Sequence, residues 1–192
     1  MRVHGKYIIE RRTGLDQRKY KKYKPELRED FHHLCGYCGK SEDVTKKGFE
    51  IDHFIPQALA GNLTDSYANL VYACFTCNRK KSAKWPTNDV SSPHDGNIGF
   101  CDPATDEFDR HLQRDETGKI ISCSPVGEYM VKQAFHFDKR PTDVIWKAMQ
   151  IVDMKKALRD RWNTLAPEDK DEYMEIDKEL ESLLGYIFDK EE

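Results

Sequence analysis

The stretch from Phe49 to Ser82 reads FEIDHFIPQALAGNLTDSYANLVYACFTCNRKKS, and CGYCGK (residues 35–40) lies just upstream. Together they hold two Cys-x2-Cys pairs, Cys35 with Cys38 and Cys74 with Cys77. Two such pairs can place four sulfurs about 2.3 Å from one zinc ion, and an all-thiolate site leaves no position for a substrate. The spacing therefore predicts a structural zinc site.

The composition supports a metal in the fold. Leu, Ile, Val and Phe account for 40 of the 192 residues, which is near the lower limit for a chain that folds by apolar burial alone. No run of about 18 apolar residues is present, and the N-terminus lacks the apolar stretch of a signal peptide. We therefore expect a cytoplasmic protein without a membrane segment. In the reducing cytosol, six cysteines indicate metal binding and not disulfides.

Two neighbours between the cysteine pairs, Asp52 and His53, carry chemical groups of different kinds. They lie in residues 48–55, where apolar and polar side chains alternate as in a short strand. Successive side chains of a strand point to opposite faces, so we expect a division of roles. A carboxylate is a hard oxygen donor for a cation, and a free imidazole titrates at about pH 6.5, which suits proton removal from water. Asp52 is therefore predicted to bind a metal and His53 to act as a general base.

The residues after the last cysteine extend this site. Asn78 follows Cys77 directly, so the zinc site would fix its position. Its carboxamide oxygen, the Asp52 carboxylate and waters would form an oxygen-rich site, which favours Mg²⁺ or Mn²⁺. The next three residues are basic and are expected to contact the phosphates of a nucleic acid: Arg79, Lys80 and Lys81.

The order Asp-His, Asn-Leu and Cys-x2-Cys-Asn-x-Lys over residues 31–85 resembles the HNH, or ββα-metal, endonuclease family. The resemblance implies that Asp52 and Asn78 hold the catalytic metal and that His53 is the base. It implies further that Asn69 orients the base and holds the connecting loop. The family has His at the final position, so Asn78 makes this chain an HNN variant. Flanking Cys-x2-Cys pairs are a common decoration of the family.

The resemblance implies hydrolysis of phosphodiester bonds, for which we expect DNA as the substrate, with 5′-phosphate and 3′-hydroxyl products. His53 would take a proton from water, and a divalent ion would stabilise the charge that develops on the phosphate. A second interpretation is a catalytically inactive, zinc-stapled adaptor that binds nucleic acid or protein. The presence of Asp52, His53 and Asn78 favours the enzyme, because an adaptor has no use for them.

The expected fold class is α+β and mainly helical, with a ββα-metal core, a four-cysteine zinc knuckle and a helical C-terminal region. Helices are predicted over residues 25–34, from residues 74–78 up to Pro86, and over residues 142–188, where apolar side chains recur every three to four positions. Turns and short strands are expected over residues 98–125. We divide the chain into a basic N-terminal arm or helix (1–30), the zinc-stapled nuclease core (31–95) and a mixed, then helical, extension (96–192).

The net charge is −3, but the charges are unevenly distributed: the N-terminal end is basic and the C-terminal end is acidic. Residues 1–28 hold ten Lys and Arg against three Asp and Glu, and residues 165–192 hold three against eleven. A basic segment with Tyr20 and Tyr23 interleaved is typical of an arm that follows a phosphate backbone. A solvated helix face explains the same segment equally well.

Beyond residue 95, GFCDPATDEFDRHLQRDETGKI and RPTDVIWKAM are similar to the downstream region of a bacterial HNH group that includes the nuclease subunit of the Septu anti-phage system. That nuclease works with an ABC-type ATPase, so the resemblance implies antiviral defence and an ATPase partner. The acidic C-terminal helices would then be a docking surface, or they simply cover the core. Cys101 and Cys123 are expected to be small buried side chains and not metal ligands. His111 is expected to be a structural histidine, with an extension of the active site as the alternative.

Overall fold

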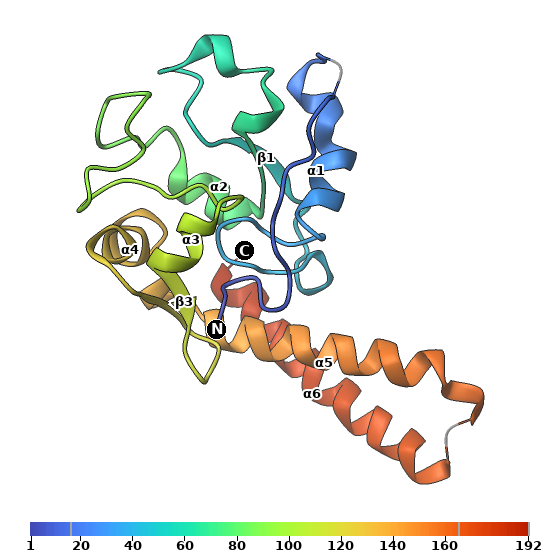
Figure 1. Cartoon of the computed structure of the whole chain (residues 1–192). Coiled ribbons are helices and arrows are strands. Elements are labelled where there is room, and N and C mark those ends of the chain that lie inside the picture. The colour runs from blue at the N-terminus through green and yellow to red at the C-terminus, as the bar shows by residue number, and fades with distance from the viewer. Residues whose placement is uncertain (16, 165, 192) are drawn as a thin grey trace.

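The computed structural model describes residues 1–15, 17–164 and 166–191, and it combines short strands with helices (Figure 1). The strands pair as two antiparallel hairpins, β1 with β2 and β3 with β4. The elements are α1 (Lys24–Asp30), β1 (Glu50–His53), β2 (Leu70–Ala73), α2 (Phe75–Lys81), α3 (Asp106–His111), β3 (Leu112–Arg114), β4 (Ile120–Ser122), α4 (Pro125–Tyr129), α5 (Thr142–Asp160) and α6 (Pro167–Glu191). About half of the described chain is helical, so the mainly helical α+β class is confirmed.

The ββα unit is formed by β1, β2 and α2. In the antiparallel register, Asp52 faces Val71 and His53 faces Leu70. The strand predicted over residues 48–55 is confirmed in its central part, and Asp52 is buried whereas His53 is partly exposed. β2 is buried at all four positions, so its sequence lacks the alternation that reveals a half-exposed strand. β1 and the start of α2 thus present the candidate site residues side by side.

Two predicted helices are shorter than expected. α1 ends at Asp30 because His32 and His33 adopt positive φ angles of 52° and 62°, which a right-handed helix excludes. α2 ends at Lys81, and Ser82 has a φ of 49°, so the helix stops well before Pro86. The chain from Ser82 to Thr105 then contains no helix or strand, apart from an isolated bridge between His94 and Gly99.

The main hydrophobic core includes residues from all three segments that we distinguished in the sequence. Val3 and Ile9 from the N-terminus, the zinc-site cysteines and Phe137 belong to one buried cluster. Arg11 donates two hydrogen bonds of 2.8 Å to Asp102, which lies in the long connection after α2. The first residues are therefore packed into the body and do not form a free arm.

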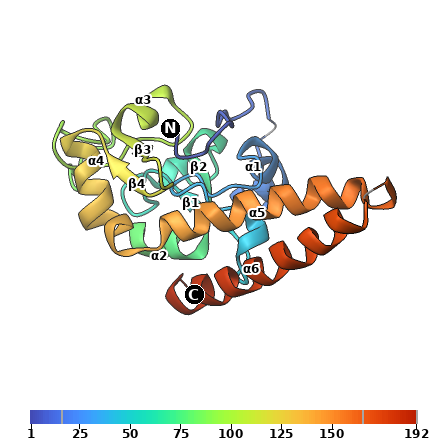
Figure 2. The same ribbon diagram turned by 90° about the horizontal axis from the view of Figure 1, so that it is seen from below.

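Helices α5 and α6 form a hairpin that projects from the body (Figure 1). A second cluster of buried apolar side chains, with Ile145 from α5 and Leu180 from α6, holds the two helices together. Val44 from the body joins this cluster. Seen from below, the end of α6 returns to lie beneath the body near α2 (Figure 2), where Glu191 is buried. The two helices predicted over residues 142–188 are confirmed.

The region between α2 and α5 holds the small β3–β4 hairpin, as expected for residues 98–125, together with α3 and α4, which the sequence did not predict. Arg114 on β3 connects this region by hydrogen bonds to the N-terminal segment, the first cysteine pair and α5. Its buried guanidinium donates to the carbonyl oxygens of Val3, Cys38, Gly118 and Thr142. None of the helices in the described part of the chain is both long and apolar enough to cross a membrane.

Candidate active site and zinc cluster

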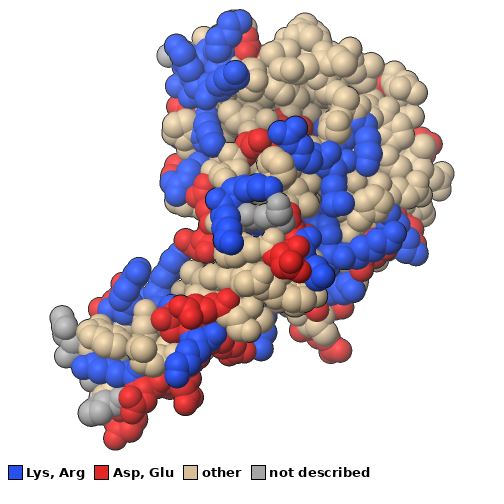
Figure 3. Space-filling view, turned by 180° about the vertical axis from the view of Figure 1, so that it is seen from behind, with Lys and Arg blue, Asp and Glu red and all other residues tan. Residues whose placement is uncertain are grey.

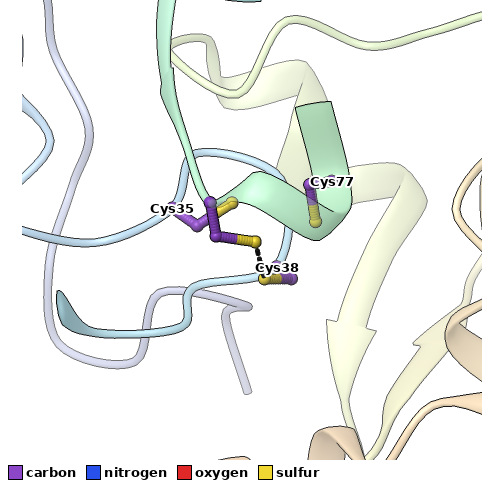
Figure 4. Close-up of side chains that lie close together, drawn as sticks. Cys35, Cys38 and Cys77 are labelled. Carbon is purple, nitrogen blue, oxygen red and sulfur yellow. Dashed lines mark hydrogen bonds between the residues drawn. The ribbon is translucent and has the colours of Figure 1, made fainter. Parts of the chain in front are cut away.

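The four cysteines of the two Cys-x2-Cys pairs meet at one point, as the sequence predicted. Cys35, Cys38, Cys74 and Cys77 are buried, and their sulfurs all lie within 4.8 Å of one another. Figure 4 shows the side chains of Cys35, Cys38 and Cys77 converging, with a dashed line from Cys38 to Cys74. That sulfur-to-sulfur distance is 3.8 Å, which equals the separation of two ligands about 2.3 Å from a tetrahedral zinc ion.

The surroundings of the cluster also suit zinc. Burial raises the pKa of the Cys35 and Cys77 thiols, so four adjacent thiolates need a cation to remain charged. Arg140 lies beside the sulfurs: its Nη1 is 3.3 Å from Cys77 Sγ and its Nη2 is 4.0 Å from Cys38 Sγ. Donors placed next to thiolate ligands orient them and offset part of their negative charge.

Arg140 connects the zinc cluster to the end of the chain. Its Nε and Nη2 donate to the Glu191 carboxylate at 2.5 and 2.6 Å, and both side chains are almost fully buried. Burial lowers the pKa of Arg140, but the Cys77 thiolate and the Glu191 carboxylate outweigh burial and raise it overall. Thr76 on α2 also donates to the Glu191 carbonyl oxygen, at 2.7 Å. The last residues of α6 are thus part of the shell around the zinc cluster.

Asp52 lies inside the ββα unit with only 6% of its surface exposed. Its Oδ2 accepts a hydrogen bond of 2.6 Å from the Tyr37 hydroxyl and lies 3.2 Å from Lys81 Nζ. Burial raises the pKa of Asp52 and lowers the pKa of Lys81, while the attraction between the two charges opposes both shifts. No hydrogen-bond partner of Asp52 Oδ1 is found among the described residues, so this oxygen can bind a cation.

The imidazole of His53 is held in one tautomer. Its Nε2 lies 2.9 Å from the Thr64 carbonyl oxygen, which can only accept a hydrogen bond. Nε2 therefore carries the proton, and Nδ1 keeps a lone pair that can accept a proton from water. Gln57 Nε2 lies 3.2 Å from His53 Nε2. With the proton on His53 Nε2, the Gln57 carboxamide is turned so that its oxygen takes this place. The Tyr20 ring contacts the imidazole edge-on, with 4.8 Å between ring centroids.

Asn69 holds the loop between β1 and β2. Its Oδ1 accepts from the Ile55 amide at 2.8 Å, and its Nδ2 donates to the carbonyl oxygens of Ile55 and Leu63 at 3.0 and 3.4 Å. Leu63 directly precedes Thr64, whose carbonyl oxygen fixes His53. The side chain of Asn69, which is itself buried, thus links both ends of the loop that orients the imidazole.

Asn78 lies on the first turn of α2 and contacts β1. Its Nδ2 donates to Glu50 Oε2 at 2.5 Å, which leaves the carboxamide oxygen for another partner. Glu50 also lies 3.9 Å from Arg79. A cleft of about 370 Å³ is lined by Asp52, His53, Asn78 and Arg79, together with Pro56, Gln57, Ala58, Ser82 and Ala83. The fold thus brings the predicted base and both predicted oxygen ligands to one cleft.

The expectation of a phosphate contact is wrong for Lys81. Its side chain is fully buried, where it pairs with Asp52 and donates to the His53 carbonyl oxygen at 2.8 Å. The physical reason is helical periodicity: Lys81 lies four residues after Cys77 and so shares the buried face of α2. Arg79 is exposed and Lys80 partly exposed, so these two remain available to a ligand.

The two remaining cysteines differ from each other. Cys101 is fully buried, as expected, but Cys123 is exposed, so that expectation was wrong. His111 lies close to Cys101 and does not line the cleft with His53.

Comparison with known proteins agrees with this geometry. Residues 35–84 match the model of the HNH endonuclease family. This part of the chain is therefore similar to an HNH endonuclease domain. Over 83 residues, the chain is also 31% identical to the Septu protein PtuB of Bacillus thuringiensis. The aligned segment covers 39% of this chain and 32% of that protein. The chain thus matches about a third of the relative's length. No solved structure matches significantly.

The sequence did not predict several residues that contact the candidate site. Glu50 lies two positions before Asp52 on the same strand, so the period of two could have placed both on one face. The contact of Tyr37 with Asp52 and that of Tyr20 with His53 join residues far apart in the chain, and no spacing rule predicts them.

Proposed function

We propose that the protein is a metal-dependent endonuclease that hydrolyses phosphodiester bonds in DNA, with His53 as the general base. The observation that carries the proposal is the shared cleft of His53, Asp52 and Asn78. The fixed tautomer of His53 favours the enzyme over a catalytically inactive adaptor, because an adaptor needs no imidazole with an oriented lone pair.

His53 would act through Nδ1. Because Nε2 donates to the Thr64 carbonyl oxygen, Nδ1 can take a proton from a water molecule as that water attacks phosphorus. The imidazolium that results keeps its hydrogen bond to Thr64, so the ring need not turn during the reaction. Asn69 would act as a positioning residue, since it holds the loop that carries Thr64.

Asp52 and Asn78 fit a divalent cation. The Tyr37 hydroxyl donates to Asp52 Oδ2 and Lys81 Nζ forms an ion pair with the same oxygen, which leaves Oδ1. Asn78 Nδ2 donates to Glu50, which leaves the carboxamide oxygen. Two oxygen donors in a partly open cleft suit Mg²⁺ or Mn²⁺, which keep several waters. When bound, such an ion supplies charge stabilisation to the phosphate and to the leaving 3′-oxygen. Lys81 and Tyr37 would keep Asp52 ionised and oriented.

Basic side chains near the cleft would position the DNA backbone without reading its sequence. Arg79 lines the cleft, and Tyr20 lies against His53. Next to Tyr20 the chain exposes Lys19, Lys21, Lys22 and Lys24. Figure 3 shows Lys and Arg side chains gathered at this end of the body, away from the hairpin tip. The N-terminal segment would thus act as a packed basic rim.

We further propose that the protein takes part in antiviral defence with an ATPase partner. The similarity to a Septu protein supports this role. The outer part of the α5–α6 hairpin, with Met154 and Met174 more than half exposed, is a candidate docking surface for the partner. Apolar side chains of this size are typical of interface cores.

The enzyme is tested by cleavage of plasmid DNA, single-stranded DNA and RNA with Mg²⁺, with Mn²⁺ and with EDTA. We expect cleavage of DNA with either ion and none with EDTA. An Asp52→Asn variant that remains folded should need more metal for the same rate. Purified wild-type protein that retains its zinc but cuts none of these substrates with either ion would contradict the proposal.

A further inference from the structure

A second group of metal-binding side chains lies apart from the zinc cluster and from the His53 cleft. It consists of His94, Cys101 and His111, whose ligand atoms all lie within 4.8 Å of one another. The two imidazole rings are 5.6 Å apart between centroids. The proposed nuclease chemistry uses none of the three.

A tight turn brings the first two of these residues together. His94 and Gly99 form an isolated antiparallel bridge, and the Phe100 amide donates to the Pro93 carbonyl oxygen at 2.9 Å. Gly99 has a φ of +134°, and a Cβ there would lie 2.3 Å from Pro93 O. Only glycine allows this approach. The turn thereby sets Cys101, two residues after Gly99, beside His94.

Helix α3 supplies the other side of the group. Glu107 and His111 are four residues apart, so both lie on one face of the helix. Glu107 Oε1 is 3.0 Å from His94 Nε2 and 3.7 Å from His111 Nε2. A carboxylate oxygen therefore lies between the two imidazoles as a fourth donor.

The environment orients these donors. Cys101 is fully buried, and the side chains of His94 and His111 are 21% and 17% exposed. His111 Nδ1 lies 2.5 Å from Ser124 Oγ, which also accepts from the Gly127 amide at the start of α4. If Nδ1–H donates to Ser124, the lone pair of Nε2 is directed at the group, as in metal sites where the second ring nitrogen of a histidine is hydrogen-bonded.

We propose that His94, Cys101, His111 and Glu107 bind a second zinc ion. The thiolate and the two imidazoles are the three ligands whose atoms lie within 4.8 Å of one another, and Glu107, beside both imidazoles, would supply the fourth. This mixture of donors suits Zn²⁺ better than Mg²⁺ or Ca²⁺. Four protein ligands leave no position for a substrate, so the role is structural. The ion joins α3 to the connection from Ser82 to Thr105, which has no helix or strand of its own. Connections of that length are uncommon in compact domains unless something fixes them.

A metal-free ion pair is the competing explanation. His94 Nε2 would then donate to Glu107, and the Gly96 amide, 3.2 Å from His94 Nδ1, would donate to that nitrogen. The two explanations differ in metal content and in the ligands around the zinc, and neither measurement depends on nuclease activity.

The test is the zinc content of the full-length protein after dialysis against a chelating resin, by elemental analysis and native mass spectrometry. We expect two zinc ions per chain, one for each group of ligands. Cys101→Ser should bind one, whereas the matched control Cys123→Ser, an exposed cysteine outside both groups, should keep two. One zinc ion in the wild type, or two in Cys101→Ser, would overturn the proposal.

Because Cys101→Ser could also fail to fold, zinc-edge X-ray absorption of the wild-type protein gives an independent result. The proposal predicts a mixed shell of sulfur with nitrogen and oxygen. A shell of four sulfurs alone would overturn it.

Discussion

At the scale of single residues, the site depends on buried charges that are paired. Asp52 and Lys81 are both almost fully buried, and the Tyr37 hydroxyl and the His53 carbonyl oxygen complete their hydrogen bonds. A buried ion pair adds little net stability, but the loss of one partner leaves an uncompensated charge, which is strongly destabilising. Lys81 thus supports the site from within, whereas its neighbour Lys80 is partly exposed.

The first prediction separates these two lysines. Lys81→Met should lower the free energy of unfolding by about 3–5 kcal/mol, because Asp52 loses its buried partner. Lys80→Met, the matched control, should stay within about 0.5 kcal/mol of the wild type, as surface substitutions usually do. Urea denaturation at constant zinc concentration measures both. Equal effects of the two substitutions would contradict the buried position of Lys81.

At the scale of elements, the zinc cluster joins parts of the chain that are distant in sequence. The loop that carries Cys35 and Cys38 meets the start of α2, and Arg140 extends the contact to Glu191 at the end of α6. A metal bound at the four cysteines would therefore stabilise more than the ββα unit.

The second prediction concerns the thiolates. Cys38→Ser removes one ligand of a site whose metal binding is coupled to folding, so the variant should lose cooperative thermal unfolding. Circular dichroism during heating measures this. Cys123→Ser, at an exposed position, should melt like the wild type. A strong chelator should remove the cooperative thermal unfolding of the wild type, as the Cys38→Ser substitution does. An unchanged melting curve after chelation would contradict a structural zinc.

The third prediction concerns the contact between α6 and the zinc cluster. Arg140→Met removes both hydrogen bonds to the buried Glu191 carboxylate and leaves Lys40 Nζ, 4.0 Å away, as its remaining ion-pair partner. The expected loss of stability is about 3–5 kcal/mol. It also removes the hydrogen bond to Cys77, so zinc affinity should fall about 10–100-fold, as for other residues that orient metal ligands. Competition with a chromophoric chelator measures the affinity.

Two comparisons make this prediction specific. Lys190→Met, at an exposed position next to Glu191, should change neither quantity. Arg140→Met combined with Glu191→Gln should recover part of the stability, since the buried carboxylate that lost its Arg140 hydrogen bonds is then neutral. No recovery in the double variant would mean that the ion pair is not the source of the effect.

Local patterns in the sequence predicted several of the helices and strands and the cysteine cluster. The alternation around Asp52 predicted β1, the apolar periodicity predicted α5 and α6, and the two Cys-x2-Cys pairs predicted the cluster. The ends of α1 and α2 could not be predicted, because they depend on positive φ angles at His32, His33 and Ser82. None of these three is glycine, the residue that usually marks such positions.

At the scale of the whole molecule, the inner and outer ends of the C-terminal hairpin differ. Its inner end is part of the core, since Ile187 and Glu191 are buried. Its outer end projects away from the body (Figure 1). Contacts such as that of Arg140 with Glu191 span a long stretch of chain, so no local pattern could predict them.

The fourth prediction tests the outer end of the hairpin as the docking surface for the proposed partner. Met154→Glu combined with Met174→Glu should abolish co-purification with the proposed ATPase partner, because buried charges oppose association. Both side chains are more than half exposed, so the fold should be retained. Ile121→Glu, at an exposed apolar position on β4, is the control and should still bind. Loss of binding in the control alone would place the interface elsewhere.

The most direct test of the account is the rate of DNA cleavage by His53→Ala under saturating Mg²⁺, with zinc content and DNA affinity measured on the same sample. Removal of a general base should lower the rate by about 10²–10⁴-fold, while zinc content and DNA binding stay at wild-type values. His33→Ala, which changes a partly exposed histidine that does not line the cleft, should cut at the wild-type rate. Wild-type cleavage by His53→Ala would contradict the assignment of His53 as the base.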